Sequence, residues 1–239
     1  MQILILKDKH AQAQATAALI AAQAMRGAGS VFGFATGSTP IGTYEALARM
    51  AQSGAADFSG ARTFNLDEYA GLPADHPQSY RFFMDEQLFS KVRFADTQLP
   101  SGIARDLDAE CARYEQAIDL AGGIDLQLLG IGHNGHIGFN EPGDFFPDKT
   151  HCVSLAPATI EANKRFFDSA DEVPRRAITM GIGTIMRACS IVLVISGGDK
   201  AQIARQALKG PVTPSVPASI LQFHPCVTVL LDREAGAAL

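Results

Sequence analysis

Residues 31–54 read VFGFATGSTPIGTYEALARMAQSG, and this stretch decides the fold. Its first five residues are apolar and bracketed by small residues, which is typical of a buried strand. Thr39 can cap a helix, Pro40 suits the first helical position and Gly54 can end it, which predicts a helix over residues 40–53. A buried strand that passes through a short turn into a helix indicates an α/β protein.

The same alternation continues outward in both directions. Short apolar runs predict strands over residues 1–6, 63–66, 124–129, 177–180, 191–195 and 226–231. Longer segments rich in helix formers predict helices over residues 9–26, 79–89, 106–121 and 199–209. This order favours a three-layer α/β fold, in which a mostly parallel, Rossmann-like sheet carries helices on both faces. We expect one domain over residues 1–239, because no linker composition interrupts the chain.

Composition narrows the range of partners. The chain has 20 Lys and Arg against 25 Asp and Glu, a net charge of −5, which argues against a general nucleic-acid binder. The apolar runs are shorter than the ~20 residues that span a bilayer, and residues 1–6 lack a basic leader. The four cysteines are scattered without a CxxC pair. We therefore expect a cytoplasmic protein with no membrane or nucleic-acid partner, although a small anion remains a possible ligand.

In open α/β sheets, ligands bind beyond the carboxyl ends of the strands, so functional residues are expected in the segments that follow the strands. The segment Thr36-Gly37-Ser38-Thr39 follows a predicted strand and opens a helix. Small residues, hydroxyl groups and the free N–H groups of a helix N-terminus together favour a phosphate site. The alternative is a simple strand-to-helix turn with a threonine cap.

Asp67 and Glu68 follow the next predicted strand. One of the two carboxyl groups could face the cleft and act as a general base, in which case the other points elsewhere. A solvent-exposed acidic turn is the alternative.

The most informative segment is residues 130–143, GIGHNGHIGFNEPG. Although Gly130, Gly132 and Gly135 match G-x-G-x-x-G, the glycines and proline that follow prevent the long helix of a dinucleotide site. His133 and His136 lack the further ligands of a recognisable zinc motif, so we expect neither a metal nor a cofactor. Two histidines, two asparagines and Glu141 in a glycine-rich loop favour proton transfer, with a purely structural loop as the alternative.

Two further segments carry basic residues. Lys200 follows Ser196-Gly197-Gly198 at a helix start, where its charge opposes the helix dipole unless an anion offsets it. Residues 158–168, ATIEANKRFFD, predict a short amphipathic helix between prolines, within a possible lid over about residues 155–175. Arg165 in this helix could close onto a phosphate. A solvated lysine and a packed surface helix are the alternatives.

Taken together, these motifs resemble the glucosamine-6-phosphate deaminases. The similarity runs in order along nearly the whole chain, and residues 130–143 are its most specific part. The other matching segments are residues 36–40, 65–72, 79–80, 164–167 and 197–200. The related 6-phosphogluconolactonases share the fold and a GH loop, but the sequence that follows this loop differs in them. The chain therefore resembles the deaminases more closely.

The resemblance implies conversion of D-glucosamine 6-phosphate and water into D-fructose 6-phosphate and ammonium. It implies that Asp67 moves the proton between C2 and C1 and that His136 opens the sugar ring. Glu141 and Asn134 would orient that histidine; many members have Asp at the position of Asn134. The residues implied to bind substrate and its phosphate are Thr36, Gly37, Ser38, Thr39, Gly130, Arg165 and Lys200.

The sequence departs from the longer, hexameric members of the family. Their allosteric site for an acetylated sugar phosphate uses basic residues after the catalytic loop, and these are largely missing from residues 145–153 here. We therefore expect no such activation and a monomer or small homo-oligomer. Activity on another hexosamine phosphate, such as galactosamine 6-phosphate, and a non-catalytic sugar-phosphate sensor are the alternative functions.

Overall fold

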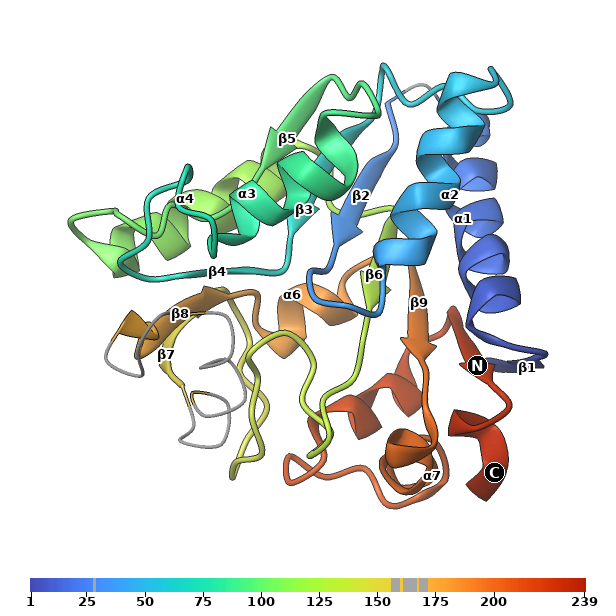
Figure 1. Cartoon of the computed structure of the whole chain (residues 1–239). Coiled ribbons are helices and arrows are strands. Elements are labelled where there is room, and N and C mark those ends of the chain that lie inside the picture. Colours follow the sequence, from blue (N-terminus) through green and yellow to red (C-terminus); the bar gives the residue numbers. More distant parts are fainter. Residues whose placement is uncertain (28, 156–159, 161–166, 168–171) are drawn as a thin grey trace.

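The computed structural model describes residues 1–27, 29–155, 160, 167 and 172–239, and its centre is a seven-stranded sheet (Figure 1). The strand order is β1-β10-β9-β6-β2-β3-β5, and every neighbouring pair is parallel. The strands are β1 (Gln2–Leu6), β2 (Val31–Phe34), β3 (Arg62–Asn65), β5 (Asp96–Gln98), β6 (Leu126–Leu129), β9 (Ser190–Ile195) and β10 (Val227–Asp232). The predicted parallel sheet is confirmed.

Helices cover both faces of this sheet. One face carries α1 (Lys9–Arg26), α2 (Ile41–Gln52), α3 (Tyr80–Met84) and the π-helical turn η1 (Asp85–Phe89). The other carries α4 (Leu107–Leu120), α6 (Ile182–Met186), α7 (Ala201–Lys209) and the short helices η5 (Pro217–Phe223) and η6 (Ala235–Ala238). Figure 1 shows α1 and α2 side by side along the sheet.

Strand β9 shows why the fold has three layers. Ile191, Leu193 and Ile195 pack into the core beneath α7, whereas Val192 and Val194 pack into the core beneath α1 and α2. Because successive side chains of a strand point to opposite faces, a strand that is apolar throughout must be covered on both sides.

A second, smaller sheet was not predicted. It contains β4 (Asp67–Tyr69), β8 (Arg176–Thr179) and β7 (His151–Ser154), in the antiparallel order β4-β8-β7. The strand predicted at residues 177–180 therefore lies outside the parallel sheet. Strands of three or four residues leave too little pattern in the sequence to reveal their pairing partners.

The predicted cap of α2 is wrong. The helix begins at Ile41 after Pro40, and no side chain among the described residues caps it. The predicted helix over residues 199–209 is divided into a 3₁₀ turn, η4 (Gly198–Lys200), and α7. Thr39 is therefore left outside the helix, at the end of the loop that follows β2.

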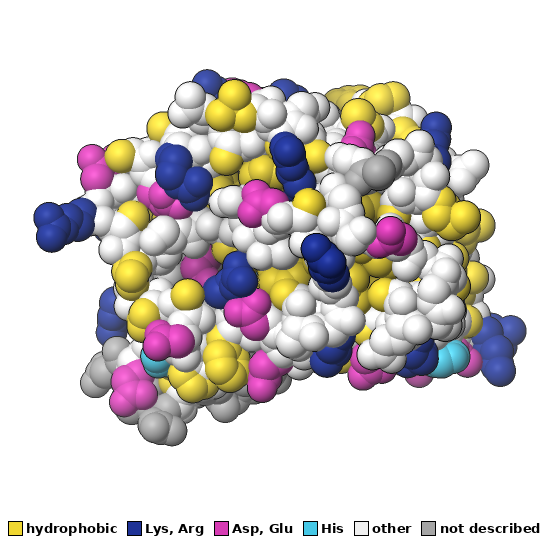
Figure 2. Space-filling model, turned by 90° about the horizontal axis from the view of Figure 1, so that it is seen from above, with side chains coloured by type: hydrophobic (Ala, Val, Ile, Leu, Met, Phe, Trp, Pro, Cys, Tyr) yellow, Lys and Arg dark blue, Asp and Glu magenta, His cyan; other side chains and the backbone are white. Residues whose placement is uncertain are grey.

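The molecular surface shows no segregation of charge on the face drawn in Figure 2, where the described Lys and Arg side chains alternate with Asp and Glu. Within the described residues, no helix has the length and apolar character required to cross a lipid bilayer.

Candidate active site

The strand order creates a crevice between β2 and β6. These strands are neighbours, but the chain continues from β2 toward β3 on one side, whereas β9 lies on the other side of β6. Loops that leave adjacent strands in opposite directions open a ligand site at the carboxyl end of the sheet. A cavity of about 370 Å³ lies there. Its lining residues are Ala35, Thr36, Gly37, Ser38, Thr39, Leu66, Asp67, Tyr80, Gly130, Ile131, His133, Asn134, His136, Gly138 and Phe139.

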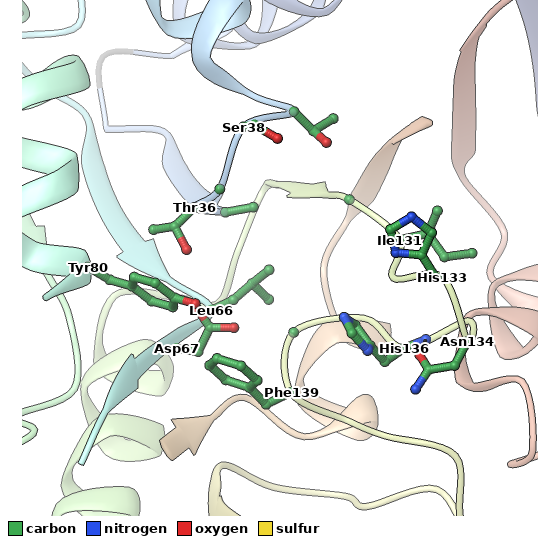
Figure 3. A pocket seen from close by; sticks show the side chains of 15 residues that line it. Thr36, Ser38, Leu66, Asp67, Tyr80, Ile131, His133, Asn134, His136 and Phe139 are labelled. Atoms are coloured by element: carbon green, nitrogen blue, oxygen red, sulfur yellow. Dashed lines mark hydrogen bonds between the residues drawn. The ribbon is translucent and has the colours of Figure 1, made fainter. Parts of the chain in front are cut away.

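The loop after β2 forms one wall, and it contains all four predicted phosphate-binding residues from Thr36 to Thr39. The Tyr44 hydroxyl from α2 donates to the Ala35 carbonyl, and the Tyr80 hydroxyl hydrogen-bonds to the side chain of Thr36. These contacts hold hydroxyl groups and backbone N–H groups around one end of the cavity, where Figure 3 shows Thr36 and Ser38.

Asp67 and Glu68 occupy the first two positions of β4, directly after the chain leaves the parallel sheet. Pairing with β8 points them in opposite directions, so Asp67 faces the cavity while Glu68 faces away from it. Glu68 accepts hydrogen bonds from the backbone N–H groups of Tyr69, Tyr80 and Arg81. The solvent-exposed acidic turn is excluded, because both side chains are buried.

Asp67 is buried, with 6% of the residue exposed. Burial, and secondarily the charge of Glu68, raises its pKa from 3.8 to about 8. An Asp with such a pKa can both take up and release a proton near neutral pH, which suits a general acid–base group.

The loop after β6 forms the opposite wall and places His136 in the cavity (Figure 3). Nδ1 of His136 lies 3.3 Å from Oε1 of Glu141. Asn134 links the two residues: its Nδ2 donates to Oε2 of Glu141 at 2.5 Å, and its Oδ1 accepts from the His136 backbone N–H at 3.2 Å. Gly132 makes this packing possible, because a β-carbon there would collide with the imidazole ring.

The second sheet anchors the far end of this loop. Nδ2 of Asn140 donates to the carbonyl groups of Ile137 and Met180, and the Phe139 N–H donates to Oγ1 of Thr179. Since Thr179 pairs with Asp67 across β8 and β4, the same strand supports the acid on one wall and the histidine loop on the other.

Lys200 lies beside the cavity but, among the described residues, outside its lining. Its Nζ donates to the carbonyl of Ile131, which does line the cavity. Burial lowers the pKa of Lys200 from its usual value, with a smaller opposing effect from Asp199.

Arg165 and most of the predicted lid helix over residues 158–168 lie outside the described residues. Two positions of the segment are described. Ile160 packs against a cluster that includes Tyr69 and Phe139, and the Phe167 ring lies 6.3 Å from that of Tyr69. These two residues therefore contact the aromatic cluster that adjoins the cavity.

Tyr80 and Phe139 line the cavity but were not predicted as site residues, and His133, one of the two histidines of the predicted proton-transfer loop, was given no role of its own. Tyr80 and Phe139 stack with ring centroids 6.0 Å apart and planes 4° apart, which builds an apolar wall next to Asp67. Phe139 and His133 lie inside the 130–143 motif, so their positions were detectable, whereas nothing local to Tyr80 predicts that α3 brings it to the cavity.

Comparison with protein-family models matches residues 7–229 to the family of glucosamine-6-phosphate isomerases and 6-phosphogluconolactonases. A glucosamine-6-phosphate deaminase of Thermoanaerobacter pseudethanolicus is 49% identical over 241 aligned positions, which cover 100% of this chain and 95% of the relative. One from Lachnoclostridium phytofermentans is 55% identical over 218 positions, covering 90% and 92% of the two chains.

Solved structures agree with these matches. A monomeric glucosamine-6-phosphate deaminase superposes with a TM-score of 0.96 at 45% identity, and the match covers 100% of both chains. A 6-phosphogluconolactonase from Thermotoga maritima superposes with a TM-score of 0.76 at 20% identity over 97% of this chain and 99% of that one, which shows a shared fold. The chain therefore belongs to the family of glucosamine-6-phosphate isomerases and 6-phosphogluconolactonases.

Proposed function

We propose that this protein is a glucosamine-6-phosphate deaminase, which converts D-glucosamine 6-phosphate and water into D-fructose 6-phosphate and ammonium. The observation that carries the proposal is the placement of Asp67 and His136 on facing walls of one cavity. An amino-sugar isomerisation requires two proton-transfer groups, one at the ring oxygen and one at the carbon atoms that exchange a proton. The relatives of the chain that carry this name support the same conclusion.

The phosphate group would bind at the end of the cavity formed by residues 36–39. Backbone N–H groups and the hydroxyls of Ser38 and Thr39 are suitable donors to phosphate oxygens. Lys200 would add a positive charge by exchanging its contact with the Ile131 carbonyl for one with the phosphate, and Arg165 would add a second.

His136 would open the pyranose ring. The imidazole can donate a proton to the ring oxygen and accept the proton of the C1 hydroxyl, which leaves an open-chain aldehyde. Glu141, 3.3 Å from Nδ1, would stabilise the protonated ring, and Asn134 would hold that carboxylate in place.

Asp67 would then catalyse the isomerisation. Its carboxylate removes the proton from C2, which gives a planar enol-amine. Asp67 then returns a proton to C1, which gives an imine at C2. Water adds to this imine and ammonia leaves, so the carbonyl of fructose 6-phosphate forms at C2. The positive charge of the substrate ammonium group next to Asp67 would favour the ionised carboxylate that the first step needs.

The four cysteines of the chain are unpaired in the structure, in keeping with a reducing cytoplasm, where we place the enzyme.

The test measures ammonia release from a panel of hexosamine 6-phosphates that includes the glucosamine and galactosamine compounds. We expect release from glucosamine 6-phosphate together with formation of fructose 6-phosphate. Asp67→Asn is expected to lose at least about 10³-fold in kcat, since the amide cannot accept the C2 proton.

Release only from galactosamine 6-phosphate would identify that compound as the substrate, with the same type of reaction. Binding without release from any member of the panel would contradict the enzyme and favour a sugar-phosphate sensor.

A further inference from the structure

His133 lines the cavity on the same wall as His136 but has no role in the mechanism above (Figure 3). Its Nε2 lies 2.6 Å from Oδ2 of Asp199, a charge-assisted hydrogen bond when the imidazole donates. The two residues come from different segments: His133 from the loop after β6 and Asp199 from the turn η4 after β9.

The turn that carries Asp199 is itself held in place. Gly197 has φ of 94°, and a β-carbon there would lie 2.6 Å from Oδ1 of Asp199, so this glycine leaves room for the carboxylate. The Gly197 N–H donates to both carboxylate oxygens of Asp232, at the end of β10. The hydrogen bond from His133 lowers the pKa of Asp199, which favours its ionised form.

A second contact runs parallel to the first. Nζ of Lys200, the residue after Asp199, donates to the carbonyl of Ile131, two residues before His133. Two adjacent residues of η4 therefore bond to two positions of the histidine loop. The contact of Lys200 is one that phosphate would displace, whereas the contact of His133 with Asp199 can persist when phosphate binds.

We propose that His133 and Asp199 form a clasp that positions Lys200 and η4 against the loop of His136, and that this clasp sets the affinity for the phosphate end of the substrate. The inference rests on the proposed function. Without the clasp, Lys200 would have to be ordered anew each time substrate binds, and this loss of preorganisation weakens binding.

The clasp can be tested because its side chains are exposed, His133 to 74% and Asp199 to 61%. Exposed ion pairs contribute little to folding, so variants are expected to remain folded. A role in folding alone would change thermal stability without changing the kinetic constants of the folded enzyme.

The experiment measures kcat and KM for glucosamine 6-phosphate in His133→Ala, Asp199→Ala and the double variant. We expect KM to rise about 3- to 10-fold in each single variant while kcat changes less than about twofold. The double variant should resemble the single ones, since either substitution already opens the clasp. His133→Gln can still donate an amide N–H to Asp199, so it should restore most of the wild-type KM.

His10→Ala, which removes an exposed histidine of α1, is the control for loss of an imidazole. The inhibition constant of inorganic phosphate should rise in parallel with KM, since the clasp acts on the phosphate end. An unchanged KM in both single variants, additive effects in the double variant, or no recovery with His133→Gln would overturn the clasp.

Failure of the proposed function is a separate outcome, seen as a wild type that releases no ammonia. The clasp is then judged by direct binding of inorganic phosphate to the wild type and the same variants. Equal dissociation constants would refute it, and weaker binding in His133→Ala and Asp199→Ala with recovery in His133→Gln would support it.

Discussion

At the scale of single residues, burial raises the pKa of Asp67, which suits the residue to proton transfer. The same burial lowers the stability of the fold when the carboxyl group is ionised. A carboxyl whose pKa rises from 3.8 in the unfolded chain to about 8 in the fold binds a proton more tightly when folded. Stability is therefore unaffected by this group below about pH 4 and decreases as pH rises toward 8, by at most about 1.4 kcal/mol per pH unit.

Asp67→Asn removes both the catalytic carboxylate and the loss of stability that its ionisation causes. We expect the variant to lose activity and to exceed the wild type in free energy of unfolding by an amount that grows between pH 5 and pH 8. Denaturant unfolding at both pH values measures the difference, with Asp119→Asn on the exposed side of α4 as the control for the amide itself. A difference that is constant with pH would refute the assigned ionisation.

Asn134 offers a second test at this scale. An amide can hold Glu141 and the backbone of His136, but it adds no negative charge beside the imidazole. We expect Asn134→Asp to shift the pH profile of kcat/KM by about 0.5 to 1 pH unit, since the new carboxylate favours the protonated form of the site. Asn134→Ser, which adds no charge, is the control, and identical profiles for wild type and Asn134→Asp would contradict the expectation.

At the scale of elements, the adjacent acids of β4 have separate tasks. Asp67 faces the cavity, whereas Glu68 caps the start of α3 by accepting from the backbone N–H groups of Tyr80 and Arg81. Glu68 also accepts from the N–H of Tyr69 in β4. Ser79 adds a third bond at this helix end, where its Oγ accepts from the Phe82 N–H. Glu68 thus joins the second sheet to the helix that brings Tyr80 to the cavity.

Glu68→Gln should separate the two tasks. The amide N–H₂ cannot accept the bond that one carboxylate oxygen now receives, so we expect the free energy of unfolding to fall by about 1–3 kcal/mol. Activity per folded molecule should fall far less than in Asp67→Asn. Glu86→Gln, an exposed site on η1, should stay within about 0.5 kcal/mol of wild type. A Glu68→Gln variant that is as stable as wild type would show that the cap contributes nothing.

At the scale of the whole molecule, the central question is assembly. The segment over residues 145–153 contains Lys149 as its single Lys or Arg, so we expect it not to bind an acetylated sugar phosphate.

We therefore expect hyperbolic saturation by glucosamine 6-phosphate and no activation by N-acetylglucosamine 6-phosphate. Sedimentation should give a mass of one or two chains of 25.4 kDa. A sigmoidal curve that the acetylated sugar phosphate makes hyperbolic, or a hexamer in solution, would contradict this view of the molecule.

The sequence by itself determined the alternation of strands and helices and the identity of the chemical groups. The apolar runs of β2 and β9 are local signals, because strands buried on both faces are almost continuously apolar. The residues of 130–143 were recognisable because glycines, histidines and Glu141 lie within one short segment.

Only the tertiary structure decided how those groups are arranged. Whether Asp67 or Glu68 faces the cavity depends on the pairing of β4 with β8, which lies far along the chain. The bond between His133 and Asp199 joins residues 66 positions apart. Such choices are set by long-range pairing and by the burial it produces, and neither leaves a periodic pattern in a strand of three residues or in a single turn.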